Sequence, residues 1–334
     1  MKHTATLLAL LAFLDGCAMR EALNPAYFQI DQGQLPAPNV RLNIRGLGPC
    51  TDNPDRSLHL DSSQPVTVLT HGCFGSSGQF RGLAQVLAFQ GQQTACFTYD
   101  DRDALTKSAT EMRNAVNQLS EQTRIPQITV IGHSQGALVS RKSLTDLPVQ
   151  PPKRRAGLRL VTISGPFDGI ASAETCGKTW LSWLSVGLLP VSCYVVTGAK
   201  WMDITYSSRF IREPGVLIPE VGSYLKIDTD ETGTCRREEN GRCIESDDVF
   251  SLAEQHNPLV DADPRARRMM VRAGHVEIVG DQRVAPTKLI ALLQEQGVLL
   301  PTAPERLSAF RQMLARVYQD ETLLQPDIFQ QIAE

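Results

Sequence analysis

A strand–turn–helix segment at residues 127–147 constrains this chain more than any other stretch. Residues 127–131 are apolar and β-branched, as in a buried strand, and residues 137–147 carry apolar side chains for one face of a helix. The turn between them, GHSQG at residues 132–136, fits the pattern G-x-S-x-G. A serine in such a turn adopts a strained backbone, and the flanking glycines let strand and helix approach closely. The segment predicts a Ser134 hydroxyl lifted above the sheet edge, where it can act as a nucleophile.

Strands and helices alternate on both sides of this segment. The other expected strands are residues 40–44 (an edge strand), 65–70, 94–99, 158–163, 225–227 and 268–271. The expected helices are residues 79–91, a helix capped by Asp103 that runs to about residue 121, residues 249–255, and residues 287–296 between Pro286 and Gly297. This alternation predicts a mostly parallel α/β sheet flanked by helices.

The alternation stops between residues 166 and 222. The sequence TWLSWLSVGLLPVSCYVVTGAKW in this region is rich in Trp, Leu and Val and lacks the polar face that a surface helix needs. We interpret the region as an inserted helical cap over the active site, with apolar surface towards the substrate. Buried core helices are the alternative interpretation.

Composition and charge exclude few classes of protein but narrow the partners. The chain has 334 residues, of which 42% are hydrophobic and 21% charged, so it can bury a sizeable core. A formal net charge of −3 does not indicate a nucleic-acid partner. The eight cysteines form no C-x-x-C pair, so we expect no zinc or other metal site.

The first 20 residues have the pattern of an export signal. Their apolar core, residues 7–14, is too short to span a membrane as a helix. The sequence LDGCA at residues 14–18 resembles a bacterial lipoprotein signal, which implies removal of residues 1–16 and a lipid anchor on Cys17. A plain signal peptide cleaved nearby is the alternative. Both interpretations predict export from the cytoplasm, and the first predicts a lipoprotein of the bacterial cell envelope, at the outer membrane.

Seven further cysteines in an exported chain predict disulfides. Cys235 and Cys243 bracket the polar sequence RREENGR with its turn-forming Asn-Gly, and they are the clearest pair. Cys176 and Cys193 could close the preceding segment. The remaining three, which leave one thiol over in any pairing, are Cys50, Cys73 and Cys96.

Three features in chain order look like the α/β-hydrolase fold and, within it, like lipases and esterases. They are the HGCFGSSG loop at residues 71–78, the GHSQG turn, and a late histidine after the last expected strand. The resemblance covers residues 64–297, with residues 17–63 as an N-terminal lead and residues 298–334 as a C-terminal helical extension. It implies an ester hydrolase that acts through a Ser–His–Asp triad and an acyl-enzyme, without a cofactor.

The nucleophile requires a base, because a free serine hydroxyl reacts poorly at neutral pH. The chain order of this fold, nucleophile then acid then histidine, leaves His256 and His275 as candidates. His275 follows the last expected strand and precedes the closing helix, where the resembling family carries its histidine. The resemblance therefore implies His275 as the base, with His256 as the alternative.

The acid that orients the imidazole is expected after the strand at residues 225–227. The carboxylates available there are Asp228, Asp230, Glu231, Asp247 and Asp248. The sequence SDDVFSL at residues 246–252 is similar to the D-G-x-V-P-L segment of lipases, with Asp248 in place of the family's glycine. This similarity implies Asp247 as the acid. Asp230, which lies nearer the end of the strand, is the alternative.

Two backbone N–H groups should stabilise the oxyanion of the tetrahedral intermediate. By resemblance these belong to Gln135, directly after the nucleophile, and to Cys73, directly after His71 and Gly72. Because this role uses only the backbone, Cys73 could also take part in a disulfide.

The sequence thus predicts a lipid-anchored hydrolase whose substrate is an acyl ester or a lipid. The apolar cap motivates the further hypothesis that the acyl chain is long, as for a lipase or phospholipase. An acyltransferase, thioesterase or amidase could use the same triad, because the GHSQG turn indicates the acyl-enzyme and not its acceptor. A non-catalytic envelope protein that keeps the fold as a binding platform is the remaining alternative.

Overall fold

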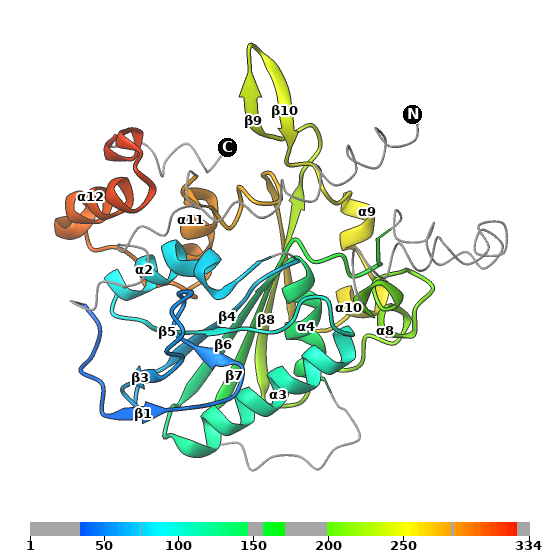
Figure 1. Cartoon of the computed structure of the whole chain (residues 1–334), viewed down its shortest axis with the longest axis horizontal. Helices are drawn as coiled ribbons and strands as arrows, with labels where there is room; N and C mark the ends of the chain where they lie inside the picture. Colours follow the sequence, from blue (N-terminus) through cyan, green and yellow to red (C-terminus); the bar gives the residue numbers. More distant parts are fainter. Residues whose placement is uncertain (1–33, 74, 146–155, 171–198, 282–283, 326–334) are drawn as a thin grey trace, which may run out of the picture.

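A computed structural model describes residues 34–73, 75–145, 156–170, 199–281 and 284–325. In these residues a central sheet of seven strands has the order β11-β8-β7-β6-β4-β5-β2 (Figure 1). The strands are β2 (Leu47–Gly48), β4 (Val66–Thr70), β5 (Gln93–Phe97), β6 (Gln127–His133), β7 (Gly157–Ile163), β8 (Val221–Asp230) and β11 (Ala266–Arg272). All neighbours are parallel except β2 and β5, so the predicted mostly parallel α/β sheet is confirmed.

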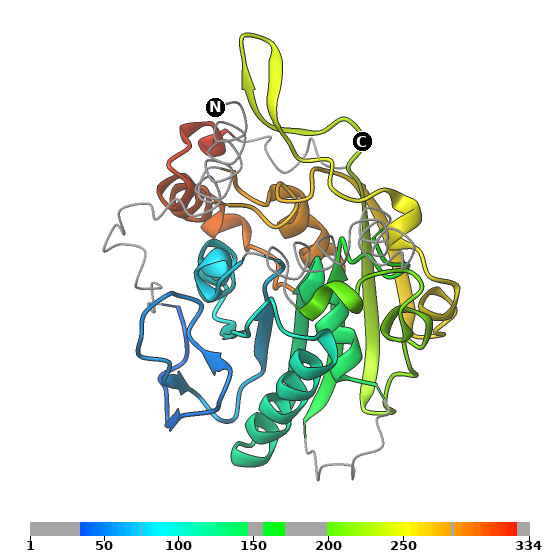
Figure 2. The same cartoon turned by 45° about the vertical axis from the view of Figure 1, so that its right-hand side comes forward.

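Helices cover both faces of the sheet (Figures 1 and 2). On one face lie α3 (Leu105–Gln122) and α4 (Gln135–Ser143), and on the other lie α2 (Arg81–Phe89), α11 (Thr287–Glu295) and α12 (Leu307–Tyr318). Successive side chains of a strand point to opposite faces, so Val68 packs into the core beneath α3 and Leu69 into the core beneath α2. The strands are therefore apolar on both faces, which explains why their sequences read as continuous hydrophobic runs.

The cap of α3 differs from the expected one. Asp103 does not cap the helix; its carboxylate instead contacts Lys107 one turn further on. The Leu105 backbone N–H donates to Asp203 Oδ2 over 2.7 Å, so a carboxylate distant in the sequence takes this role. The prediction of Asp103 was wrong because sequence proximity alone cannot reveal a partner that tertiary structure supplies.

The expected edge strand at residues 40–44 belongs to a different sheet. β1 (Val40–Leu42) pairs with β3 (Leu58–Leu60) as a separate two-stranded sheet, and β2 forms the edge of the central sheet. A disulfide between Cys50 and Cys96 attaches this region to β5. It identifies the bonded pair among the three cysteines that the sequence left open.

A hairpin of β9 (Cys235–Glu239) and β10 (Arg242–Ser246) projects from the body of the molecule (Figure 1). The sequence predicted only a polar loop here, but its Asn240-Gly241 turn and its Cys235–Cys243 disulfide are confirmed. Both turn residues have positive φ, 51° and 71°, which is the backbone that a two-residue hairpin turn requires.

The remaining described elements are short helices around the end of the sheet and on the C-terminal segment. They are η3 (Ser77–Phe80), η5 (Ala199–Met202), α8 (Arg209–Arg212), α9 (Leu252–Gln255), α10 (Pro258–Asp261), η6 (Pro304–Arg306) and η7 (Glu321–Leu324). None of the helices that the structure describes is long and apolar enough to cross a membrane. Outside the described residues lie the signal segment, Cys17, the Cys176–Cys193 pair and most of the expected cap.

Candidate active site

Ser134 sits in the tight turn between β6 and α4, where its backbone has φ 56° and ψ −127°. A Cβ added at Gly136 would lie 2.3 Å from the Thr70 carbonyl oxygen, and one at Gly132 would lie 2.3 Å from the Gly136 carbonyl oxygen. Only glycine fits such approaches, because real Cβ atoms do not come closer than about 3 Å to another heavy atom. The strained serine and the two space-requiring glycines that the motif predicts are therefore present.

His275 follows β11 and is held against the residue before the serine. Its carbonyl oxygen accepts a hydrogen bond from His133 Nε2 over 2.8 Å, and the two imidazole rings are 4.7 Å apart. Phe250 meets the His275 ring edge-on at 4.8 Å. Burial lowers the pKa of His133 to about 3, so this second imidazole is neutral and acts as a structural support.

The carboxylate that contacts the imidazole is that of Glu231, directly after β8. Glu231 Oε1 lies 2.8 Å from His275 Nδ1, and the Glu231 side chain is 0% exposed. The prediction that Asp247 takes this position was wrong. A residue at the end of a strand is held more firmly than a residue in a loop. The position of Glu231 directly after β8 is therefore the sequence feature that could have identified it as the partner of the imidazole.

Asp247 supports the same histidine through its backbone. The Asp247 carboxylate accepts hydrogen bonds from the backbone N–H groups of Val276 and Glu277 over 2.9 and 3.0 Å. Its carbonyl oxygen accepts one from the His275 N–H over 2.9 Å. Asp247 therefore fixes the turn that carries the imidazole.

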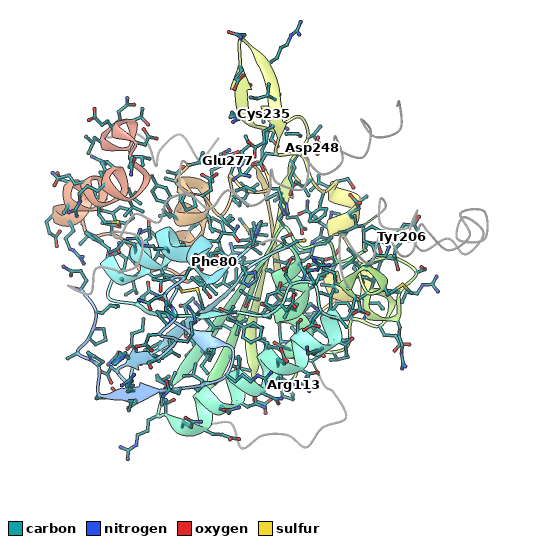
Figure 3. The ribbon with its side chains drawn as sticks, in the orientation of Figure 1. Phe80, Arg113, Tyr206, Cys235, Asp248 and Glu277 are labelled. Atoms are coloured by element: carbon teal, nitrogen blue, oxygen red, sulfur yellow. A yellow bond between two sulfur atoms is a disulfide. The ribbon has the colours of Figure 1, made fainter. Side chains whose placement is uncertain are left out.

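The other candidate side chains lie elsewhere. Asp230 contacts the exposed Arg272. Asp248, labelled in Figure 3 near the base of the hairpin of β9 and β10, accepts a hydrogen bond from the Gly233 N–H. His256 contacts Asp261 over 3.1 Å, in a separate group of charges around Lys226. None of these contacts brings a candidate to His275.

Five hydrogen-bond donors surround the Glu231 carboxylate. Oε2 accepts from the backbone N–H groups of Val249 and Phe250, each over 2.8 Å. Oε1 accepts from the hydroxyls of Thr229, over 2.8 Å, and Ser164, and faces the imidazole. Burial alone would raise the pKa of Glu231, but the hydrogen bonds from His275, Ser164 and the Phe250 N–H hold it below the ordinary value. The site therefore keeps a buried carboxylate ionised beside the imidazole.

The expected oxyanion donors flank the serine. A Cβ at Gly72 would lie 2.9 Å from Ser134 Cβ, so the backbone leading to Cys73 runs directly along the nucleophile. Among the described cysteines Cys73 is a free thiol, 2.7 Å from the buried Lys200 ammonium, and burial raises the pKa of this thiol. The Lys200 ammonium also forms a salt bridge with the Asp101 carboxylate over 3.0 Å. The backbone carbonyl oxygen of Asp101 in turn accepts a hydrogen bond from the Gln135 side-chain amide. The two loops beside Ser134 are thus joined through Asp101.

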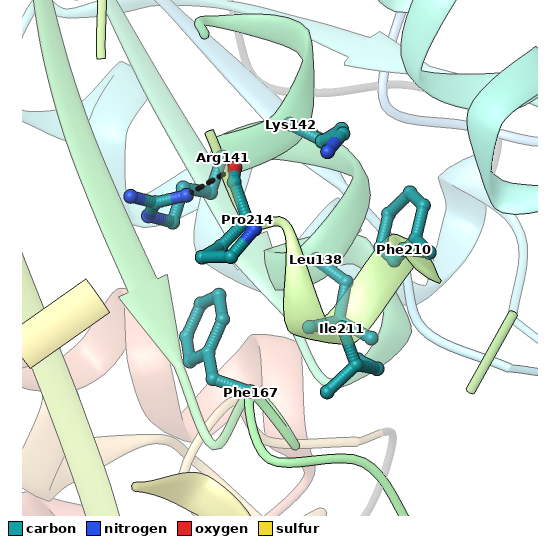
Figure 4. Close-up of a pocket in the computed structure, with 7 residues that line it drawn as sticks. All are labelled: Leu138, Arg141, Lys142, Phe167, Phe210, Ile211 and Pro214. Atoms are coloured by element: carbon teal, nitrogen blue, oxygen red, sulfur yellow. Dashed lines mark hydrogen bonds between the residues drawn. The ribbon is translucent and has the colours of Figure 1, made fainter. Parts of the chain in front are cut away.

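A small, mostly apolar crevice lies beside the nucleophile helix. It is lined by Leu138, Arg141, Lys142, Phe167, Phe210, Ile211 and Pro214 (Figure 4). Arg141 closes one side, where its guanidinium donates to the Pro214 carbonyl oxygen over 2.7 Å. In the part of the chain that the structure describes, no group of three or more His, Cys, Asp or Glu side chains could hold a metal ion.

Solved structures share this fold. A lipase of Bacillus licheniformis, BlEst2 in its propeptide form, is 13% identical, with a TM-score of 0.51 over 80% of this chain and 55% of that one. Its mature form gives 14% identity and a TM-score of 0.48 over 79% and 100%, and esterase B of Lactobacillus rhamnosis gives 13% and 0.49 over 96% and 99%. The fold, with a strained serine in the turn after β6 and a histidine held against the residue before it, defines an α/β-hydrolase-fold protein.

A family model described as "Putative serine esterase (DUF676)" matches residues 62–194, which hold the HG loop and the nucleophile turn. No curated protein matches the chain. With the fold, the family match makes this chain an ester hydrolase.

Proposed function

We propose that Ser134, His275 and Glu231 form the catalytic triad of this ester hydrolase. The observation that carries the proposal is the 2.8 Å contact between Glu231 Oε1 and His275 Nδ1, with His275 held against His133, the residue before the serine on its strained turn. With Nδ1–H donating to Glu231, the other ring nitrogen, Nε2, is left as the base that accepts a proton.

The reaction follows from these roles. Nε2 takes the proton of the Ser134 hydroxyl as its oxygen attacks the ester carbonyl, and Glu231 stabilises the imidazolium that forms. The imidazolium then protonates the leaving alcohol, which leaves an acyl-enzyme. Water, activated by the same imidazole, releases the acid. The backbone N–H groups of Cys73 and Gln135 stabilise the oxyanion in both steps.

The test of the triad is active-site labelling. A fluorophosphonate probe should label the wild-type protein, and Ser134→Ala should remove both labelling and hydrolysis of an activated ester. Asp248→Asn is the matched control, since its carboxylate contacts the Gly233 N–H and not the imidazole. Equal hydrolysis by Ser134→Ala and the wild type would contradict the proposal.

We extend the proposal to the substrate, which on this view is an ester with a long acyl chain. The support is apolar surface on the side of the nucleophile helix, in the crevice with Leu138, Phe167 and Phe210, and the 70% exposed Met202 on η5. A series of p-nitrophenyl esters tests it, with kcat/KM expected to rise from acetyl to long-chain esters. Activity confined to acetyl and butyryl esters would contradict this part of the proposal and leave the triad standing.

We also propose a lipid anchor on Cys17 that holds the enzyme at the bacterial outer membrane. The support is the LDGCA sequence after a short apolar stretch. Cys17→Ser should move the protein from the membrane fraction to the soluble fraction without loss of specific activity. Unchanged membrane association would count against the anchor.

A further inference from the structure

Ser164 is a buried residue with a strained backbone that lies next to the proposed triad. It directly follows β7, is 0% exposed and has φ 51°, a backbone that favours glycine. Its N–H donates to the Ile227 carbonyl oxygen over 2.9 Å, which ties it to β8. A glycine would adopt this backbone without strain. A reason for a serine at this position must therefore lie in its side chain, and the hydroxyl is the group that can interact.

The Ser164 hydroxyl meets the carboxylate and the imidazole together. Its Oγ hydrogen-bonds Glu231 Oε1 and Thr229 Oγ1, and it lies 3.1 Å from His275 Nδ1. Thr229 is held in turn by Gln255, whose amide oxygen accepts from the Thr229 N–H over 2.8 Å. The hydroxyl therefore sits where the acid and the base of the site face each other.

We infer that Ser164 is a positioning residue for the proposed triad, acting through Glu231. Its single proton is donated to Glu231 Oε1, as is that of Thr229, so the Ser164 oxygen is left to share the His275 Nδ1–H. The donated proton offsets part of the carboxylate charge and fixes the direction from which Oε1 faces the imidazole. This inference rests on the triad proposed above.

Removing the hydroxyl should change both the rate and its pH dependence. Without that donor the carboxylate presents more negative charge to the imidazole, so the protonated imidazole is favoured and the acidic limb of kcat/KM moves to higher pH. The charged and titratable groups that face His275 from the surrounding elements are Glu231, Asp247 and the neutral His133. All three stay in place when only Ser164 is changed.

The experiment compares Ser164→Gly with Ser164→Ala. Both remove the hydroxyl, but glycine relieves the positive φ and alanine keeps the strain, so the glycine variant should have the higher Tm. If Ser164 positions the triad, kcat should fall equally in both variants, by about tenfold, which corresponds to ~1.4 kcal/mol. KM should stay within about twofold of the wild-type value, and the acidic limb of the kcat/KM profile should move to higher pH. Gln319→Gly, at a similar φ of 53° on the end of α12, controls for relief of strain alone.

The outcomes separate the inference from the triad on which it rests. If kcat instead follows Tm, Ser164→Gly will have the wild-type kcat and pH profile. That result, with Ser134 still labelled by the probe, would refute the role of Ser164 and leave the triad standing. If the wild-type protein is not labelled at Ser134, the triad itself is refuted. Equal losses of kcat in two variants of unequal Tm support the inference.

Discussion

At the scale of single residues, two acidic side chains support His275, whereas the sequence predicted only one. Glu231 contacts the imidazole, and Asp247 holds the turn that carries it. The sequence narrowed the acid to five residues, because the chain order of the fold is visible in it. It could not choose among them, because the choice depends on a contact between residues 44 positions apart.

The first prediction ranks these two carboxylates by activity. Glu231→Gln should lower kcat by about a hundredfold or more, since it removes the charge that stabilises the imidazolium. Asp247→Asn should cost less, because its oxygen still accepts one backbone hydrogen bond and the imidazole keeps its acid. Steady-state hydrolysis of an activated ester measures both, and the reverse ranking would restore Asp247 as the acid.

The second prediction concerns stability against acid. The pKa of Glu231 is held below its ordinary value in the fold, so its contribution to stability is present above the unfolded pKa and is lost as pH falls through the folded pKa. Burial raises the pKa of Asp247, whose contribution has the opposite sign: it is present at low pH and lost as pH rises. Urea unfolding across acidic pH should therefore show a smaller fall in the free energy of unfolding for Glu231→Gln than for the wild type. Identical pH dependence in both would contradict this assignment.

At the scale of elements, the sequence predicts those strands and helices that carry long apolar patterns. β4, β6, β7, α2 and α11 lie close to their expected ranges because both faces of the sheet are buried. The hairpin of β9 and β10 was missed as strands because its residues are polar and mostly exposed, so no alternation marks it. β8 was expected at residues 225–227, yet it runs from Val221 to Asp230 and delivers Glu231 to the site.

The third prediction tests the contact between the HG loop and the nucleophile turn. Gly72→Ala would place a methyl group 2.9 Å from Ser134 Cβ and 3.3 Å from its Oγ, so the loop or the serine must shift. We expect kcat to fall by about tenfold or more, since a shift of about 1 Å in a catalytic group is costly. Gly222→Ala, whose nearest atom would be 3.9 Å away, is the matched control. Wild-type kcat in Gly72→Ala would show that the contact is dispensable.

At the scale of the whole molecule, the C-terminal segment is part of the core. On α12, Phe310 is 1% exposed and its ring lies 5.2 Å from that of Phe89 on α2. The Tyr318 hydroxyl would be 2.3 Å from a Cβ at Gly82, which shows how closely the two helices approach. The sequence predicted an amphipathic segment but not its partner, because a helical pattern gives the apolar face and not what covers it.

The fourth prediction belongs to this packing. Phe310→Ala should lower the free energy of unfolding by about 3–5 kcal/mol, the usual cost of removing a buried aromatic ring. Activity at low temperature should be retained, because α12 packs mainly against α2, η6 and η7 and not against the strands that lead to Glu231 and His275. Thermal unfolding and ester hydrolysis, measured together, check both parts; a variant as stable as the wild type would contradict the packing.

The projecting hairpin begins just after Glu231 and ends just before Asp247, so one insertion separates the two carboxylates in the chain while their positions in space stay close to one imidazole. Its tip at Asn240 and Gly241 is exposed, and the Cys235–Cys243 disulfide closes the strands below it. The tip is therefore a suitable attachment point. A fluorophore or affinity tag placed between Asn240 and Gly241 would report on the enzyme, and the disulfide would isolate Glu231 and Asp247 from the added chain.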